Sequence, residues 1–132
     1  MKKKAAFLPV FSAALGLAAC LVAGCSTINL DTTGDTQAVY EFGRFEMLLN
    51  ANAPTIYAAT QKALQSLDLY QTQAQLNTFD AQLHARARND QKISIEIQEI
   101  NSRQTMVRIR WGTTGNKASS LALYKAIESN LH

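Results

Sequence analysis

Residues 78–111 have the sequence TFDAQLHARARNDQKISIEIQEINSRQTMVRIRW, in which apolar and polar side chains alternate along three runs. Such alternation is typical of antiparallel strands that bury one face and expose the other to water. Two short polar segments, RNDQK at 88–92 and NSRQ at 101–104, separate the runs and predict turns. The stretch therefore predicts three consecutive antiparallel strands joined as a meander.

The alternation also assigns the side chains of these strands to two faces. The inward face is expected to carry Phe79, Ala81, Leu83, Ala85, Ala87, Ile93, Ile95, Ile97, Thr105, Val107, Ile109 and Trp111. The outward face is expected to carry a group of basic side chains, namely His84, Arg86, Arg88, Arg108 and Arg110. Glu96 and Gln98 are expected to lie between the two basic strands.

Helical spacing replaces alternation on both sides of this stretch. Residues 54–66 place small and apolar side chains on one helical stripe, and Pro54 suits a first helical position. Residues 117–131 carry a second stripe, and Asn116 is a suitable N-cap for that helix. One or two more strands are expected within residues 40–49, bent at Gly43.

A further strand is expected at residues 69–77. Its spacing predicts that one side carries Tyr70, Thr72, Ala74 and Leu76. Together the patterns predict an α+β fold in the order strand, helix, strands, helix. The expected sheet is antiparallel, has four to five strands and carries both helices on one face. Residues 39–132 are expected to form this single domain.

The first 24 residues differ from the rest of the chain. Three lysines at positions 2–4 precede an apolar run from Ala5 to Ala19, which small residues follow. This is the plan of a secretory signal peptide, and the run is shorter than the roughly 20 apolar residues that a spanning helix needs. Residues 1–24 are therefore expected to be a cleaved signal.

Two cysteines follow this signal, in the contexts LAAC and VAGC, and both contexts resemble the lipobox of bacterial lipoproteins. Cleavage before Cys20 would leave an apolar stub and a spare thiol. Cleavage before Cys25 leaves neither, so Cys25 is the favoured lipidation site and Cys20 the alternative. Residues 25–38, rich in Thr and Asp, are expected to be a flexible linker. Ser26, rather than Asp, follows Cys25, which favours the outer membrane over the inner membrane for a periplasm-facing protein.

The basic charge of the chain belongs to the expected signal. The whole chain has a formal net charge of +3, and residues 1–24 contain three lysines and no acid, so the remainder has a net charge of zero. Bulk charge therefore gives no support for a nucleic-acid partner. With Cys25 lipidated, no thiol is left for an intrachain disulfide.

The sequence contains no pattern that indicates catalysis. After Cys25 the only imidazoles are those of His84 and His132, so no metal site is expected. No Gly-x-Ser-x-Gly turn occurs, and the GTTG segment at 112–115 lacks the Lys-Ser or Lys-Thr pair of a phosphate-binding loop. We expect no enzyme and no cofactor, and we interpret GTTG as a turn.

The segment VRIRWGTTGNKASSLALYKAI at 107–127 has a distinctive order, with an aliphatic-Arg-aliphatic strand ahead of a Gly-x-x-Gly turn and a helix. With the preceding strands and helix, it resembles small bacterial lipoproteins grouped as a domain of unknown function, over about residues 40–131. The resemblance implies a lipid-anchored α+β domain. It carries over no functional residues.

The expected function is that of a binding or assembly module of the cell envelope, held on the membrane by its N-terminal lipid. Its partner is expected to be an envelope protein or polymer. The candidate contact surface consists of His84, Arg86, Arg88, Arg108, Arg110 and Trp111. Arg suits such a role because its planar group forms several hydrogen bonds at once. The same face can also be interpreted as solvated and held by cross-strand ion pairs, with Trp111 capping the core. The alternative functions are a small-molecule or lipid carrier and a catalytic domain with an unrecognised site.

Overall fold

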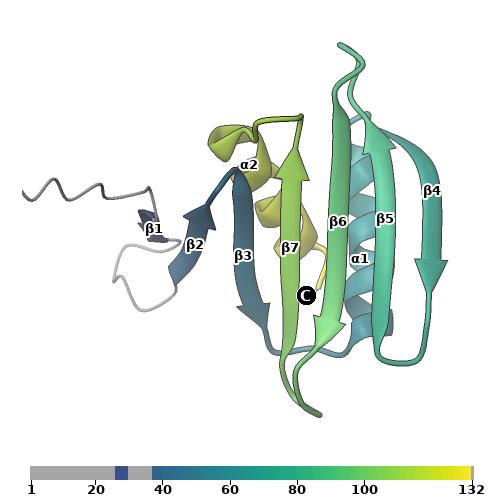
Figure 1. Ribbon diagram of the computed structural model, residues 1–132. Helices are drawn as coiled ribbons and strands as arrows, with labels where there is room; N and C mark the ends of the chain where they lie inside the picture. Colours follow the sequence, from purple (N-terminus) through teal and green to yellow (C-terminus); the bar gives the residue numbers. More distant parts are fainter. Residues whose placement is uncertain (1–25, 30–36, 132) are drawn as a thin grey trace, which may run out of the picture.

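The computed structural model describes residues 26–29 and 37–131. Within them, one antiparallel sheet of seven strands has the order β1-β2-β3-β7-β6-β5-β4, and two helices pack on one of its faces (Figure 1). The expected α+β class is confirmed, whereas the expected four to five strands are too few. The strands are β1 (Ser26–Asn29), β2 (Gln37–Glu41), β3 (Arg44–Leu49), β4 (Tyr70–Leu76), β5 (Asp80–Arg86), β6 (Lys92–Glu99) and β7 (Thr105–Trp111). The helices are α1 (Ala53–Ser66) and α2 (Lys117–Ser129).

The strands beyond the expected number come from residues 40–49, which form parts of two strands, and from the expected linker, which contains β1. Phe42 and Gly43 have φ angles of 50° and 76°, so a tight turn divides the expected bent strand into β2 and β3. β1 pairs with β2, where Ile28 lies opposite Ala38. Both of these side chains are buried in the core. The range 25–38 therefore contains β1 and the start of β2, because Ile28 gives this polar segment an apolar contact with the sheet.

The alternation of β5, β6 and β7 is largely as expected. The buried side chains of these strands are Ala81, Leu83, Ala85, Ile93, Ile95, Ile97, Thr105, Val107 and Ile109. Phe79 is the exception, because it is 66 % exposed. The backbone N–H of Asn77 donates to the carbonyl of Asp80, which closes the β4–β5 turn with Phe79 inside it. The carbonyl of Phe79 still accepts from the N–H of Glu99 on β6, but its side chain lies beyond the buried rows of β5.

The prediction that Tyr70, Thr72, Ala74 and Leu76 share one side of β4 is also wrong. The register of β4 against β5 shifts between Gln71 and Gln73. Thr72 has no partner on β5, so the strand reverses its faces at that point. Tyr70 lies opposite Arg86, on the face away from the helices, while Leu76 lies opposite the buried Ala81.

Both helices have side-chain caps at their amino ends. The Asn52 side chain accepts a hydrogen bond from the N–H of Thr55 at 2.9 Å, so α1 begins at Ala53, one residue before the expected Pro54. A carboxylate oxygen of Glu99 accepts a second bond, from the N–H of Ala53 at 2.8 Å. The predicted Asn116 cap of α2 is confirmed by its hydrogen bond from the N–H of Ser119.

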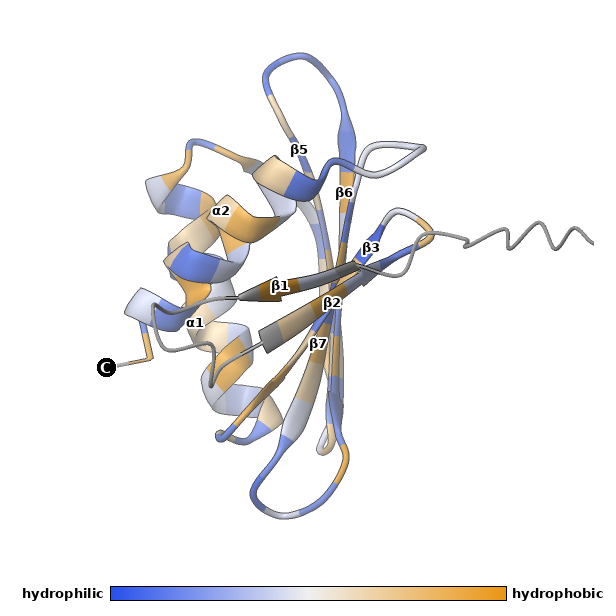
Figure 2. Ribbon diagram, turned by 90° about the vertical axis from the view of Figure 1, so that its left-hand side faces the viewer, coloured by the Kyte–Doolittle hydropathy of each residue, from blue (hydrophilic) through white to orange (hydrophobic). Residues whose placement is uncertain are grey.

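The helices occupy only one side of the sheet. α1 packs on β4, β5 and β6, and α2 packs on β3 and β7. Figure 2 shows both helices on the same side of the sheet, and in the described part of the chain neither helix covers the opposite face. We call this uncovered side the open face.

The GTTG segment forms a turn that contacts the β2–β3 turn. Gly112 and Gly115 have φ angles of 79° and 91°, which favour glycine. The Cα of Gly115 lies so close to Gly43 that a Cβ at position 115 would overlap the Gly43 backbone. Arg110 ties the same two turns, since its guanidinium donates to the carbonyls of Phe42 at 2.9 Å and of Thr113 at 3.3 Å.

Candidate contact surface on the open sheet face

The strand register arranges the outward side chains of the open face in rows that cross the strands. One row runs from β3 to β4, and we call it the central row. It consists of Glu46, Arg108, Glu96, Gln82 and Gln75, each opposite the next on a neighbouring strand. A planar polar group ends every side chain in this row, so the row can offer hydrogen bonds over five strands.

Arg108 holds the most connected position in the central row. Its Nε donates to Glu46 Oε2 at 2.8 Å, and its Nη1 donates to Gln98 Oε1 at 3.0 Å. Glu96 Oε1 lies 3.9 Å from the same Nη1. Arg108 and Glu46 are 24 % and 22 % exposed, so their ion pair is partly shielded from water. The guanidinium is thus fixed in place rather than free in solvent.

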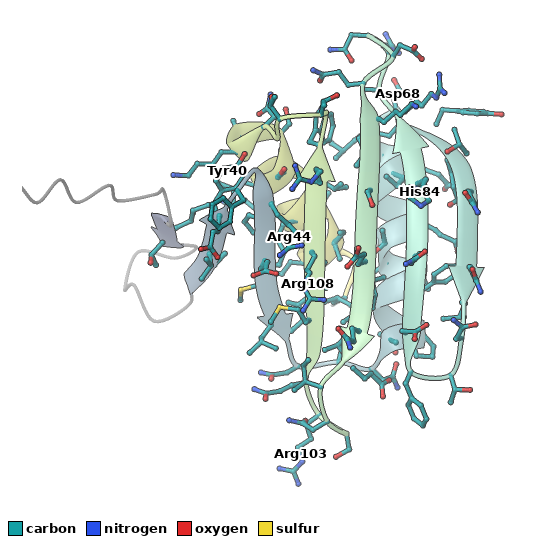
Figure 3. The ribbon with its side chains drawn as sticks, viewed as in Figure 1. Tyr40, Arg44, Asp68, His84, Arg103 and Arg108 are labelled. Carbon is teal, nitrogen blue, oxygen red and sulfur yellow. The ribbon has the colours of Figure 1, made fainter. Side chains whose placement is uncertain are left out.

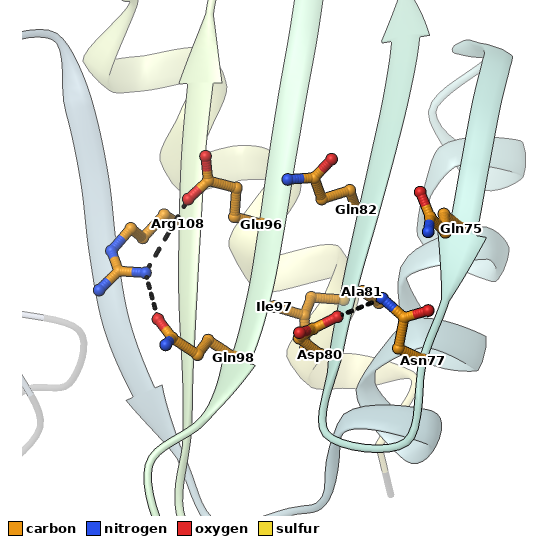
Figure 4. Close-up of a pocket in the computed structure, with 9 residues that line it drawn as sticks. All are labelled: Gln75, Asn77, Asp80, Ala81, Gln82, Glu96, Ile97, Gln98 and Arg108. Atoms are coloured by element: carbon orange, nitrogen blue, oxygen red, sulfur yellow. Dashed lines mark hydrogen bonds and ion pairs between the residues drawn. The ribbon is translucent and has the colours of Figure 1, made fainter.

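A shallow hollow of about 320 Å³ lies beside Arg108 on the open face (Figure 4). It crosses β4, β5, β6 and β7. Its lining consists of Gln75, Asn77, Asp80, Ala81, Gln82, Glu96, Ile97, Gln98 and Arg108. At one end the side-chain amide of Asn77 donates to Asp80 Oδ1 at 2.6 Å. The hollow therefore combines amides, two carboxylates and one guanidinium, a set suited to a ligand rich in hydroxyl or amide groups.

The basic residues predicted from the sequence do not form one patch. Arg108 belongs to the central row, whereas Arg110 and His84 belong to the next row, separated by Ser94. Figure 3 shows His84 on β5, apart from Arg44 and Arg108 on β3 and β7. The guanidinium of Arg110 is used by the two turns that it joins.

Arg86 and Arg88 lie further from the hollow and each has an acidic partner. Arg86 is 2.7 Å from Asp90, and Arg88 is 2.8 Å from Asp68. Both pairs are well exposed, and such pairs contribute about 0–1 kcal/mol to stability. The geometry of these two residues therefore matches the solvated ion-pair interpretation more closely than that of a free basic surface.

Trp111 lies on the opposite side of the sheet from Arg108. It pairs with the buried Ile93, is partly buried against the core, and donates from Nε1 to Gln91 Oε1 at 3.0 Å. A second hollow of about 410 Å³ lies beside it at the rim between the sheet and α2. It is lined by Leu67, Asp68, Leu69, Ala87, Arg88, Asn89, Trp111, Ser119 and Ala122.

Several residues of the central row and of the hollow were missed from the sequence. Glu46, in the central row, is the clearest case, because its contact with Arg108 joins positions 62 residues apart. The alternation of Arg44, Glu46 and Leu48 within residues 44–49 was the available signal, but the pairing of β3 with β7 is not visible in one sequence. Gln75 and Gln82 lay on predicted strands and were passed over because amides carry no charge.

The described residues contain no group of three or more His, Cys, Asp or Glu side chains that could hold a metal ion. The phenol of Tyr124 has a clearly raised pKa. Burial raises the pKa of its phenol, and the hydrogen bond to Glu128 at 3.0 Å and the charge of that carboxylate raise it further. Its ring packs on Phe45, with 5.2 Å between the ring centres, so Tyr124 belongs to the core and not to the open face.

The expected anchor lies outside the described residues. Neither Cys25 nor the alternative Cys20, nor any of residues 1–24, is described by the structure. Among the described residues, neither helix is long and apolar enough to cross a membrane.

These features define a two-layer α+β domain in which helices cover one face of an antiparallel sheet and a polar hollow marks the other face. The chain belongs to the family described as "Protein of unknown function (DUF3568)", which matches residues 9–130. Membership in a domain of unknown function, expected from residues 107–127, is thereby confirmed. The lipoprotein character stays a prediction. No curated protein matches the chain.

Proposed function

We propose that this protein is a lipid-anchored module of the cell envelope that binds a polar envelope partner through its open sheet face. The observation that carries the proposal is the polar hollow beside Arg108, which crosses four strands on the face that neither α1 nor α2 covers. The polar groups of such a face can bond to water when no ligand is present. They also offer donors and acceptors at fixed spacing to a ligand of matching chemistry.

The anchor part of the proposal rests on the signal-like residues 1–24 and on the lipobox-like context of Cys25. β1 begins at Ser26, the next residue, so a lipid on Cys25 would hold the β1 edge of the sheet close to the bilayer. Neighbouring strands lie about 4.8 Å apart, which places the β4 edge roughly 29 Å away across six strand spacings. The hollow lies towards that far edge, where an envelope partner can reach it.

The partner is expected to be an envelope protein or polymer rich in hydroxyl and amide groups. The hollow contains both positive and negative groups, and Arg108 already has acidic partners. A strongly anionic ligand would have to displace Glu46 and Glu96, whereas a neutral polar ligand can bond to Gln75, Gln82 and Gln98 without breaking an ion pair.

Chemical crosslinking in intact cells tests this surface. The variant Gln82→Ala plus Gln98→Ala removes two amides from the hollow, and we expect it to lose the envelope adduct that the parent chain forms. The matched control, Thr55→Ala plus Lys62→Ala, removes two exposed polar side chains from α1 and should retain the adduct. Equal adduct yields from both double variants would refute the proposed surface.

Labelling with a lipid precursor tests the anchor. Cys25→Ala should abolish the label and leave an uncleaved precursor, while Cys20→Ala should be labelled like the parent chain. The reverse pattern would assign the lipid to Cys20, and labelling of both variants would rule out a single cysteine anchor.

A second candidate function, a small-molecule carrier, is favoured by the hollow beside Trp111, whose lining includes Leu67, Leu69 and Ala87. Trp111 is the single tryptophan of the chain, so its fluorescence reports this hollow directly. Titration with an apolar dye that accepts energy from tryptophan should show saturable quenching if the hollow binds such ligands. A linear, non-saturating response would count against the carrier.

A further inference from the structure

The β4 edge of the sheet collects exposed apolar side chains. Seven large hydrophobic residues are exposed in the described part of the chain, and four of them lie on β4 or within three residues of it. These four are Leu67, Tyr70, Leu76 and Phe79, with exposures of 38 %, 72 %, 44 % and 66 %. Two of them precede or begin the strand, and two end or follow it.

β4 also lacks the devices that usually protect an edge strand. Its seven residues, YQTQAQL, include no charged residue and no proline. Such residues at an edge prevent pairing with another chain, and β4 has only the bulge at Thr72 in their place. Among the residues that the structure describes, no strand pairs with the outer side of β4, so its backbone groups there are available to another strand.

The direction of those backbone groups follows from the β4–β5 turn. The N–H of Asn77 donates to Asp80, so the backbone of Asn77 points towards β5. Backbone groups alternate in direction along an antiparallel strand, so those of Leu76 and Ala74 point away from β5. Thr72 has no partner on β5, so it does not count in this alternation. The backbone groups of Gln71 therefore also point away from β5.

A groove of about 400 Å³ runs between α1 and β4 at this edge. Its lining includes Leu64 and Gln65 of α1, Leu69, and Tyr70 and Gln71 at the start of β4. A strand added to β4 would therefore place its helix-facing side chains into this groove, as in binding modes where a peptide extends a sheet beside a helix.

We propose that the occupant of this edge is β4 of a second copy of the chain, paired antiparallel about a two-fold axis at Ala74. In this register Ala74 lies opposite its own copy, Gln73 opposite Gln75, and Gln71 opposite Leu76. Side chains of the same face then meet, and the outward backbone groups of Gln71, Ala74 and Leu76 pair with one another.

The sequence of β4 favours itself as partner over a foreign strand. Antiparallel pairing brings the start of one strand to the end of the other, so Leu76 of each copy reaches the groove where Leu64 and Leu69 of its partner lie beside Gln61, Gln65 and Gln71. Each copy thereby covers apolar side chains of the other. No like charges meet across the axis, because β4 contains no charged residue. The product is one continuous sheet with an isologous interface.

Disulfide trapping of the full chain tests the register. Hydrogen-bonded residues in antiparallel pairs have Cα atoms about 5.5 Å apart, which is within the range of a disulfide. Ala74→Cys should therefore give a covalent dimer under mild oxidation. Ser94→Cys, on the open face of β6, and the parent chain should give only the background from Cys20 and Cys25. Ala74→Cys at background level, or an adduct whose mass is not twice that of the chain, would overturn the proposal.

A charge pair distinguishes a second copy from a foreign strand. Gln73→Lys plus Gln75→Lys places like charges opposite each other twice across the axis, whereas Gln73→Lys plus Gln75→Glu places opposite charges there. We expect sedimentation of the full chain in detergent to show dimers at least about tenfold weaker for the first variant than for the second. Equal self-association of the two variants, with equal melting temperatures, would refute the two-fold pairing.

Discussion

Gly115 lies where two turns touch, and the contact leaves no room for a side chain. Its φ of 91° already favours glycine, and a Cβ would overlap the backbone of Gly43 and approach the hydroxyl of Tyr40. Gly112 has a similar φ of 79°, but its nearest neighbour, the amide of Gln91, is 3.6 Å from where a Cβ would be. Alanine at position 112 would therefore meet only backbone strain, whereas alanine at position 115 would meet both strain and steric overlap.

We predict that Gly112→Ala lowers the free energy of unfolding by about 1–2 kcal/mol, the cost of a left-handed conformation for alanine. Gly115→Ala should cost clearly more, about 3 kcal/mol or above, because the two turns must also separate. Urea unfolding of both variants measures the difference. Equal losses would mean that the turns do not contact each other as described.

Tyr124 gives the core a dependence on alkaline pH. Its phenol ionises near pH 10 in the unfolded chain, and burial together with Glu128 raises this pKa in the folded protein. The folded state thus keeps the proton at pH values where the unfolded state has lost it. The contribution of the protonated phenol to the free energy of unfolding is complete below pH 10 and is lost as the pH rises above that value.

We predict that between pH 8 and pH 11 the parent chain loses about 1 kcal/mol more stability than Tyr124→Phe, which has no phenol to ionise. Urea unfolding at both pH values gives the two losses, and the other tyrosines cancel in the comparison. If Tyr124→Phe lost as much stability as the parent chain, the phenol would not be buried beside Glu128.

Among the elements, β1 differs most from its expected role. The sequence of residues 25–38 has the composition of a linker, yet Ile28 is 8 % exposed and lies opposite Ala38 of β2. Thr27, next to it, is exposed. If β1 is part of the domain, its one buried side chain contributes to folding.

We predict that Ile28→Ala lowers the free energy of unfolding by about 2 kcal/mol, at the low end for a core truncation because β1 is an edge strand. Thr27→Ala should change it by less than about 0.5 kcal/mol. Chemical unfolding of both variants is the measurement. Indistinguishable stabilities for the two variants would mean that residues 26–29 are a linker and not part of the folded domain.

The elements that could be predicted from the sequence are those with a strong local period. β5, β6 and β7 alternate over seven or eight residues, and α2 has both a stripe and the Asn116 cap, so local patterns were sufficient. β1 is only four residues long, and the bulge at Thr72 changes faces without any change of composition. Neither leaves a period to detect.

The candidate site was predictable only in part, for a topological reason. Arg108 could be placed on the outward face because β7 alternates. Its strongest partner, Glu46, comes from β3, which joins the sheet beside β7 after a separation of 62 residues. Strand order across such a distance is set by the whole fold, so the ionic environment of Arg108 required the structure.

At the scale of the whole molecule, the sheet has three distinct surfaces. The helices close one face, the open face carries the polar hollow, and the β4 edge carries a groove lined by both apolar and amide side chains. The chain continues before β1 at the other edge, where the proposed lipid would attach. These surfaces do not overlap, so pairing at the β4 edge would leave the open face uncovered.

The central claim is that the open face contacts a polar envelope partner, and site-specific photo-crosslinking of the full chain in intact cells tests it most directly. A photoreactive residue at Gln82 would lie in the hollow, and one at Lys62 would lie on the outer side of α1. We predict a discrete adduct, distinct in mass from a dimer of the chain, from position 82 and none from position 62. No such adduct from position 82, or equal adducts from both positions, would contradict the account.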